Sequence, residues 1–258
     1  MQSLKNKVVK MLPKASNLES LSLAEMYKNA IELIGVIKTV EVYTESESHR
    51  FAEVQLATHK NYFHPATHAL AKEVVTLHTV RVFGELVDVF AASQDEHKNR
   101  SCGKLKQGKW VFIQGNLSSE GVIAATAING MDNIDTLRTH KNSVNLVGRI
   151  KEVVVHAQEY TKRFVEVKLF TESSRVNAQG KTVKKGELHT LYVFGKEIDL
   201  FLKRKQTDAP VIQRGHVLSI CGEQDYCELD QHGHLVIKVQ SIYKVVTSGL
   251  QKHIDMMV

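Results

Sequence analysis

The segment "RFAEVQLAT" at residues 50–58 and the segment "RFVEVKLFT" at residues 163–171 follow one pattern, Arg-Phe-x-Glu-Val-x-Leu-x-Thr, at an offset of 113. Three more pairs of segments match in the same order along the chain. They are "NAIELIGVI" (29–37) with "NSVNLVGRI" (142–150), "LHTVRVFGELVD" (77–88) with "LHTLYVFGKEID" (188–199), and "GKWVFIQG" (108–115) with "GHVLSICG" (215–222). The four matches occur in the same order in both copies, and the offset between the copies changes only from one match to the next. This indicates an internal duplication with insertions in the loops.

Each copy has the pattern of a small all-β domain. Runs of Val, Ile, Leu, Phe and Thr alternate with polar residues and end at glycine or charged turns, which predicts four or five strands per copy. Apolar residues at helical spacing place one helix between the third and fourth strands. This layout predicts two tandem OB-folds, which are five-stranded Greek-key barrels, with a two-layer sandwich as the alternative. The expected boundaries are a basic N-terminal leader at 1–24, barrels at 25–135 and 140–248, and a C-terminal tail at 249–258.

Composition excludes several classes of function. Of the 258 residues, 43% are hydrophobic, and no apolar run approaches the roughly 20 residues that cross a bilayer, so we expect no membrane segment. Cys102, Cys221 and Cys227 form no CxxC pair, and a zinc site that adds His232 or His234 fits no usual ligand spacing. We therefore expect no metal and no cofactor. The chain also lacks GxGxxG, GxxxxGK[ST], HExxH and GxSxG, so we expect no enzyme.

The net charge of +6 is unevenly distributed. Residues 1–20 hold four lysines and one acid, residues 21–141 hold 13 basic and 14 acidic residues, and residues 142–258 hold 17 basic and 13 acidic residues. Local charge, more than total charge, decides whether a surface attracts phosphates. We therefore expect the second copy to supply charge, and the first copy to supply stacking, oligomer contacts or protein contacts.

Strand alternation separates a core face from an outer face. Val54 and Leu56 share one face, as do Val167 and Leu169, so the opposite face is the outer one. That face mixes aromatic and basic side chains, which stack on bases and meet phosphates. The candidate nucleic-acid-binding residues are Arg50, Phe51, Tyr62, Arg81, Phe83, Trp110 and Phe112 in the first copy, and Arg163, Phe164, Lys168, Phe170, Arg175, Lys181, Lys184, Lys185, Tyr192, Phe194 and Lys196 in the second.

Two features of this set stay open. The segment "ESSRVNAQGKTVKKGE" (172–187) predicts a long basic hairpin suited to a phosphate backbone, although an ordinary solvated loop fits the same residues. The aromatic residues also fit an interface with the other domain or with a subunit partner, because interfaces favour the same residue types.

The ordered blocks of each copy resemble those of the bacterial and mitochondrial single-stranded-DNA-binding proteins, from about residue 29 to residue 245. The resemblance implies that Phe83 and Phe194, before the repeated "FG" glycine, stack on bases. It gives the same role to Tyr62. At the matching place in the second copy stands Arg175, which loses stacking and gains charge.

The chain departs from the family elsewhere. Leu77 and Leu188 replace a family tryptophan, so backbone electrostatics is expected to carry more of the affinity. His78 and His189 match a family histidine near the subunit interface and are expected to be structural. The last residues, "QKHIDMMV", lack the acidic tail of bacterial members.

The segment "HTVRVFGEL" (78–86) is similar to OB-fold proteins of kinetoplastid mitochondria, which act in kinetoplast DNA maintenance, RNA editing or mitochondrial RNA stability. The opening "MQSLKNKVVKMLPKAS" (1–16) is compatible with a transit peptide and equally with a solvated lysine tail. We expect a mitochondrial protein, with the bacterial cytoplasm as the alternative location.

These observations predict a non-catalytic protein that binds single-stranded DNA or RNA with low sequence specificity, in organellar DNA maintenance or RNA metabolism. Family members assemble four OB-folds, and a chain with two reaches that number as a homodimer or within a larger nucleoprotein complex. The alternative is an architectural OB-fold subunit of a mitochondrial ribonucleoprotein, for RNA editing or mitoribosome assembly, that acts mainly through protein contacts.

Overall fold

The structure, a computed structural model, describes residues 28–44, 50–64, 67, 70–90, 105–132, 141–156, 163–176, 182–202, 210–227 and 234–245. Within those ranges it does not describe the side chains of residues 63, 173–176, 182–184, 226–227 and 234–235. The expected leader (1–24), the expected tail (249–258) and Lys181 lie outside the described residues. No helix in the described part of the chain has the length and apolar character needed to cross a membrane.

In the parts of the chain that the structure describes, each copy contributes five strands and one short 3-10 helix. The first copy contains β1 (Lys28–Thr44), β2 (Arg50–Phe63), β3 (Leu70–Phe83), η2 (Gly84–Val89), β4 (Trp110–Leu117) and β5 (Ile123–Met131). The second contains β6 (Lys141–His156), β7 (Phe164–Val176), β8 (Thr182–Val193), η3 (Gly195–Leu200), β9 (Val217–Cys227) and β10 (His234–Val245). The expected helix between the third and fourth strands is therefore confirmed as a six-residue 3-10 helix within the described residues.

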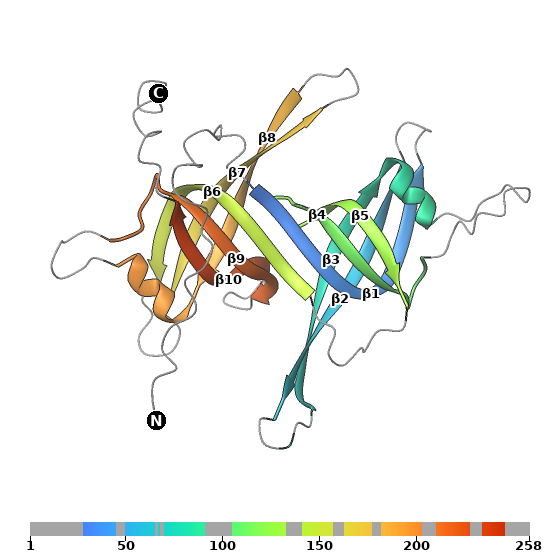
Figure 1. Ribbon diagram of the computed structural model, residues 1–258, viewed down its shortest axis with the longest axis horizontal. Helices are drawn as coiled ribbons and strands as arrows, with labels where there is room; N and C mark the ends of the chain where they lie inside the picture. The colour runs from blue at the N-terminus through green and yellow to red at the C-terminus, as the bar shows by residue number, and fades with distance from the viewer. Residues whose placement is uncertain are drawn as a thin grey trace, which may run out of the picture.

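Each set of strands closes into a barrel. The order is β1-β2-β3-β5-β4 and back to β1 in the first copy, and β6-β7-β8-β10-β9 and back to β6 in the second. The pairs β3–β5 and β8–β10 are parallel, and the other pairs are antiparallel. This is the Greek-key arrangement of the OB-fold (Figure 1), so the predicted fold class, two tandem OB-folds, is confirmed.

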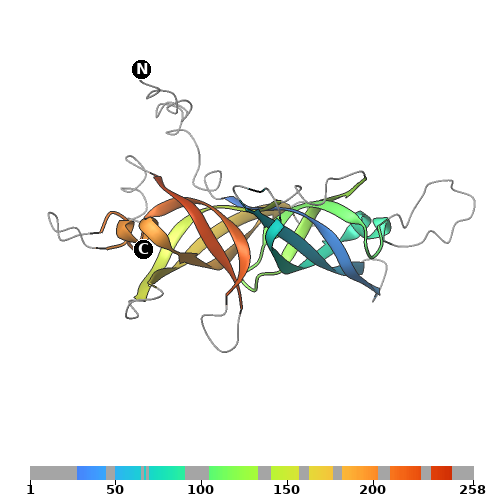
Figure 2. The ribbon, with the colours of Figure 1, turned by 90° about the horizontal axis from the view of Figure 1, so that it is seen from below.

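One strand pair joins the two barrels. β1 runs antiparallel to β6, and Ile31 pairs with Val144, its own equivalent at the repeat offset of 113. Lys28 pairs with Val147 and Ile34 with Lys141, so the register is symmetric about the Ile31–Val144 pair. The two copies are thus related by a local twofold axis. The barrels lie side by side (Figure 2), and the β2–β3 and β7–β8 hairpins project to opposite sides (Figure 1).

The barrel interiors contain the side chains that alternation assigned to the core. Val54, Leu56, Val167 and Leu169 are fully buried within one large apolar cluster. Burial of Val, Ile and Leu on the inner face of every strand is the main stabilising contribution to such small barrels. The outer face is left free for side chains that contact solvent or partners.

The repeated "FG" pair has a local physical cause. Gly84 and Gly195 have φ of 60° and 72°, in the left-handed region that favours glycine. The preceding Phe83 and Phe194 are extended, so the glycine turns the chain from the third strand into the 3-10 helix. This turn fixes each phenylalanine at the end of its strand.

Gly35 in β1 and Gly148 in β6 lie where a neighbouring backbone approaches closely. A Cβ on Gly35 would collide with the carbonyl oxygen of Ala57, and one on Gly148 with that of Phe170. Because backbone cannot swing away, we expect Gly35→Ala to lower the free energy of unfolding by about 1–3 kcal/mol, measured by urea denaturation. The exposed Lys38→Ala is the control, with an expected change within about 0.5 kcal/mol. Equal effects in the two variants would contradict the role of the close approach.

Candidate nucleic-acid interface

The outer face of the first barrel carries a row of three rings from three adjacent strands. Tyr43 of β1 pairs with Phe51 of β2, which pairs with Phe83 of β3. The ring centroids of Tyr43 and Phe51 lie 4.8 Å apart with planes at 17°, and those of Phe51 and Phe83 lie 6.1 Å apart. Tyr43 is 40% exposed and Phe83 51% exposed. Phe83 therefore presents a ring to solvent at the place where the sequence predicted one.

The arginines beside this row are engaged by carboxylates. Nη1 of Arg50 lies 2.7 Å from Oδ1 of Asp88, and Nε of Arg81 lies 3.1 Å from Oε2 of Glu53. Exposed ion pairs contribute little net stability, so a phosphate can compete for these arginines, but it must displace a neighbouring negative charge. The predicted cations of the first barrel are present, and their charge is largely neutralised locally.

The outer face of the second barrel carries a larger ring cluster. The rings of His156 and Phe164 stack with centroids 4.3 Å apart and planes at 9°. Phe164 lies 5.1 Å from Tyr192 and 5.8 Å from Phe194, measured between ring centroids. Nζ of Lys238 lies 5.7 Å from the centroid of the Phe194 ring, within cation–π range.

Two sequence expectations need correction here. Phe164 and Tyr192 were expected to be open to solvent, but they are only 7% and 6% exposed. They lie on the outer face, in a small cluster with Val236 and Phe194 that is separate from the main core. The expectation of exposure was wrong because His156 and Phe194 cover them, and strand alternation cannot show which outer side chains cover one another. Phe194 itself is half-buried.

The cations of the second barrel differ in their surroundings. Nζ of Lys168 lies 2.9 Å from Oγ1 of Thr190 and 2.7 Å from Oε1 of Glu166. Burial acts to raise the pKa of Glu166, but the hydrogen bonds and charges of Lys168 and His156 together outweigh it, so this pKa is lowered and the carboxylate stays charged. Arg163 and Lys196 are exposed and form no ion pair among the described side chains.

The β7–β8 hairpin is confirmed as a long two-stranded arm. Arg175 pairs with Val183, and Lys184 with Ser174, through the backbone, although the side chains of these residues are not described. Lys185 is exposed, and its Nζ lies 2.5 Å from Oε1 of Glu187. A phosphate-binding role for the arm stays a prediction.

The remaining predicted rings are distributed over other parts of the surface. Trp110 is half-buried beside His59, with ring centroids 5.9 Å apart, and Phe112 is half-buried on the same strand. Half-buried Phe170 lies 5.1 Å, ring centroid to Nζ, from Lys151. These rings do not join the two ring rows, so the structure brings together only part of the predicted set.

The predicted Tyr62 lies apart from the ring rows, at the cleft between the barrels. Its ring is 46% exposed and lies 5.7 Å from Nζ of Lys60.

Three outer-face residues were missed by the sequence analysis, namely Tyr43, His156 and Lys238. Tyr43 and His156 are equivalent at the offset of 113. They lie beyond the matched blocks, near the ends of the long strands β1 and β6. Strict alternation from the buried Ile37 and Ile150 would have placed both on the core face, because each lies six residues further along its strand. The register shifts between Ile37 and Thr39 and between Ile150 and Glu152 turn them to the outer face, and no sequence pattern signals these shifts. Lys238 carries no sequence signal either, because β10 reaches the ring cluster only through its pairing with β8.

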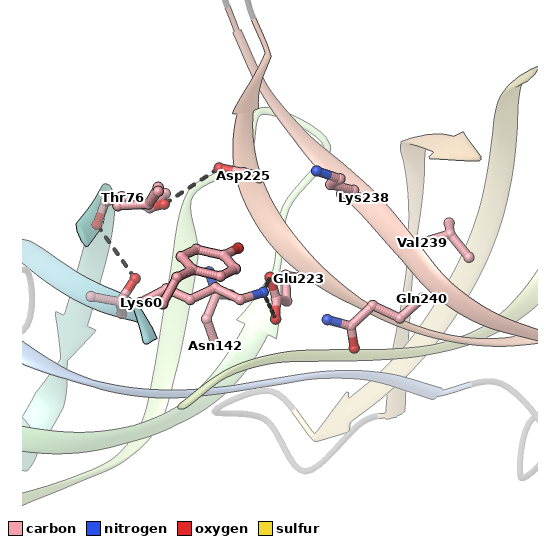
Figure 3. Close-up of a pocket in the computed structure, with 11 residues that line it drawn as sticks. Lys60, Thr76, Asn142, Glu223, Asp225, Lys238, Val239 and Gln240 are labelled. Atoms are coloured by element: carbon pink, nitrogen blue, oxygen red, sulfur yellow. Dashed lines mark hydrogen bonds and ion pairs between the residues drawn. The ribbon is translucent and has the colours of Figure 1, made fainter. Parts of the chain in front are cut away.

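A polar cleft of about 110 Å³ separates the β2–β3 arm from β9 and β10 (Figure 3). Nζ of Lys60 lies 2.6 and 2.7 Å from the two carboxylate oxygens of Glu223, and Oγ1 of Thr76 lies 3.5 Å from Oδ1 of Asp225. Burial acts to lower the pKa of Lys60, but the hydrogen bond and charge of Glu223 outweigh it and raise this pKa. The cleft therefore links the two barrels by charge.

Two buried histidines lie beside the junction, as the family resemblance implied. Nε2 of His78 lies 2.9 Å from Oγ1 of Thr58, and its Nδ1 lies 2.7 Å from Oε1 of Gln224 in the other barrel. Nδ2 of Asn142 donates to the carbonyl oxygen of Gln224 at 2.7 Å. These bonds give His78 a structural role across the junction.

His189 has the equivalent place but different surroundings. Its Nε2 lies 2.8 Å from Oγ1 of Thr171, while its buried Nδ1 has no hydrogen-bond partner among the described residues. The position equivalent to Gln224 is Leu117, since Asn29 holds the backbone of Leu117 as Asn142 holds that of Gln224. A leucine cannot accept the hydrogen bond. Burial lowers the pKa of both His78 and His189 to about 4.

No family model matches the chain, and no curated protein matches it by sequence. Among solved structures it is similar to the single-stranded DNA binding protein of Thermus aquaticus. A deletion variant of that protein aligns with a TM-score of 0.61 and 14% identity, over 86% of this chain and 96% of that chain. The wild-type protein aligns with a TM-score of 0.58 and 14% identity, over 87% and 96% of the two chains. The likeness shows a shared fold.

The buried histidines predict a specific dependence of stability on pH. Their pKa values fall from 6.5 in the unfolded chain to about 4 in the folded one, so the unfolded state binds more protons between these values. Stability is complete above pH 6.5 and decreases as the pH falls towards 4. Between pH 7 and pH 5 we expect a loss of about 2 kcal/mol per histidine.

Urea denaturation at the two pH values measures this loss. His189→Leu removes one of the two groups, so its loss should be about half that of the wild type, whatever its stability at pH 7. A variant whose pH dependence equals that of the wild type would show that His189 does not resist protonation.

Proposed function

We propose that this protein binds single-stranded DNA or RNA with low sequence specificity and performs no chemistry of its own. The observation that carries the proposal is the recurrence, on both barrels, of a ring row at the same place on the outer face. Tyr43, Phe51 and Phe83 form it in the first barrel, and His156, Phe164 and Phe194 form it in the second. Flat rings on an exposed sheet suit the stacking of unpaired bases of any sequence.

The geometry favours a single strand over a duplex. Direct reading of duplex DNA generally requires a helix or a two-stranded ribbon in the major groove. The helices in the described part of the chain are two 3-10 helices of six residues each, both at barrel ends. Rings that lie across a sheet instead require bases that are already unstacked, which single strands offer.

The comparisons favour DNA, and the sequence resemblance adds RNA. The solved structures with the same fold include a single-stranded DNA binding protein. The "HTVRVFGEL" block is similar to kinetoplastid mitochondrial proteins of DNA maintenance and RNA metabolism. We propose a mitochondrial role of this kind, with the bacterial cytoplasm as the alternative location.

Binding to a labelled strand of about 30 nucleotides, DNA and RNA in parallel, tests the proposal by fluorescence anisotropy. We expect binding by the isolated protein that weakens with salt, with a slope of about 0.7 for each phosphate contact in a log–log plot. A matched duplex is the control and should bind more weakly. Absence of binding to both single strands would reject the proposal.

Single ring removals test the stacking surfaces. Phe83→Ala and Phe194→Ala should each weaken binding by about 1–3 kcal/mol, or roughly 5- to 150-fold, because each removes a ring that a base can cover. Tyr243→Ala is the matched control, since Tyr243 is an exposed ring, at 64%, outside both ring rows. Unchanged affinity in correctly folded Phe83 and Phe194 variants would remove the stacking assignment.

The oligomeric state of the protein is a further point that can be tested. We propose that two chains associate as a homodimer, which would bring four OB-folds together, or that the chain joins a larger nucleoprotein complex. Light scattering at micromolar concentration should give twice the chain mass of 29.0 kDa. A strict monomer under these conditions would reject the homodimer.

A second candidate function is an architectural subunit of a mitochondrial ribonucleoprotein, for RNA editing or mitoribosome assembly. The observation that favours it is the ring row of the first barrel, whose arginines already pair with carboxylates. Such a surface suits protein contacts. Absence of nucleic-acid binding by the isolated protein, with binding restored by partner proteins, would favour this function over the first.

A further inference from the structure

The two ring rows differ in charge although their rings are equivalent. We propose that the second barrel is the primary site for the phosphate backbone, and that the first barrel binds a strand only after the second is occupied. This inference rests on the proposed single-strand binding. It adds the order in which the two barrels bind a strand, and it names the cations that determine this order.

The charge difference appears at matched positions around the rows. In the first barrel these positions hold two arginines against four carboxylates, namely Arg50 and Arg81 with Glu41, Glu53, Glu85 and Asp88. In the second barrel they hold four cations against four carboxylates, namely Arg163, Lys168, Lys196 and Lys238 with Glu152, Glu166, Glu197 and Asp199. The net charges are 2 − 4 = −2 and 4 − 4 = 0, so the second surface is more positive by two charges.

Two differences between the copies make the second surface more positive, and the other differences partly offset them. Lys196 follows Gly195 directly after the ring of Phe194, and its equivalent after Gly84 is Glu85. Lys238 pairs with Tyr192 on the neighbouring strand. The residue that pairs in the same way with Arg81 is Ala124, so the first barrel has no cation at that place.

Placement strengthens the effect of these lysines. Nζ of Lys238 lies 5.7 Å from the centroid of the Phe194 ring. A strand whose base stacks at Phe194 would therefore bring its phosphates near this ammonium group. Lys196 and Arg163 are exposed and form no ion pair among the described side chains, so a phosphate displaces only water and counterions from them. In the first barrel a phosphate that approaches Arg50 or Arg81 meets a carboxylate within 3.1 Å of the guanidinium.

Judged by the exposure of the rings alone, the first barrel would bind a strand before the second. The first barrel exposes Tyr43 and Phe83, whereas the second covers Phe164 and Tyr192. Stacking is short-ranged, however, while phosphate attraction both steers the strand and supplies the affinity that depends on salt. A strand should therefore meet the second barrel first, and long strands should then use the rings of the first.

A reciprocal exchange of charges tests this order in the full chain. Lys196→Glu with Lys238→Ala gives the second barrel the residues of the first, and Glu85→Lys with Ala124→Lys does the reverse. The ligands are fluorescent oligothymidylates of about 8 and 30 nucleotides, titrated at two salt concentrations. All four positions are on the outer surface, and thermal melting checks that the variants fold.

We expect the wild type to bind one short strand per chain. Lys196→Glu with Lys238→Ala should weaken short-strand binding roughly tenfold and lower the salt slope by about 1.4, the share of two phosphate contacts. Glu85→Lys with Ala124→Lys should instead raise the number of short strands bound per chain to two. Phe83→Ala should weaken binding of the long strand and leave the short strand unchanged.

Two negative results are possible, and they reject different proposals. If the wild type binds two short strands with equal affinity, or if the loss of Lys196 and Lys238 has no effect, the proposed order is wrong and single-strand binding stands. If the wild type binds neither strand, the proposed function itself is wrong.

Discussion

The antiparallel pairing of β1 with β6 is the constraint on which the arrangement of the molecule depends. Its register places Ile31 opposite Val144, so the two copies of the duplicated unit face each other across a local twofold axis. The axis sends the two hairpin arms to opposite sides and sets both ring rows at equivalent places. A shift of this register by one residue would place core-facing side chains of β1 beside outward-facing side chains of β6, so the buried cores on both sides hold the register in place.

The two copies remain similar in their cores and differ on their surfaces. Inside, equivalent positions hold side chains of similar volume, because a packed barrel tolerates neither a cavity nor an extra group. At the junction the copies differ in polarity, so Gln224 reaches His78 while Leu117 offers Nδ1 of His189 no acceptor, and no other described residue supplies one. On the outer face nothing restricts volume, and charges differ most there. Divergence of function between the barrels is thus possible without cost to the fold.

Alternation identified which face of each strand is buried, and it found Phe83 and Phe194 because both lie at the repeated turn. It failed for Phe164 and Tyr192, which are covered by His156 and Phe194, side chains from other strand segments that pack on Phe164. It also failed to show that Arg50 pairs with Asp88 of the 3-10 helix. Such contacts depend on the curvature of the sheet and on the place of the helix, which no local pattern encodes.

The sequence by itself determined the duplication, the all-β barrels, the buried faces and the positions of the "FG" turns, because periodicity and glycine geometry are local properties of the chain. Only the tertiary structure decided that β1 and β6 join the barrels, that Lys238 lies over Phe194, and which cations are neutralised. The physical reason is that these features arise from pairs of groups far apart in sequence. Their distance is fixed only when both barrels have closed.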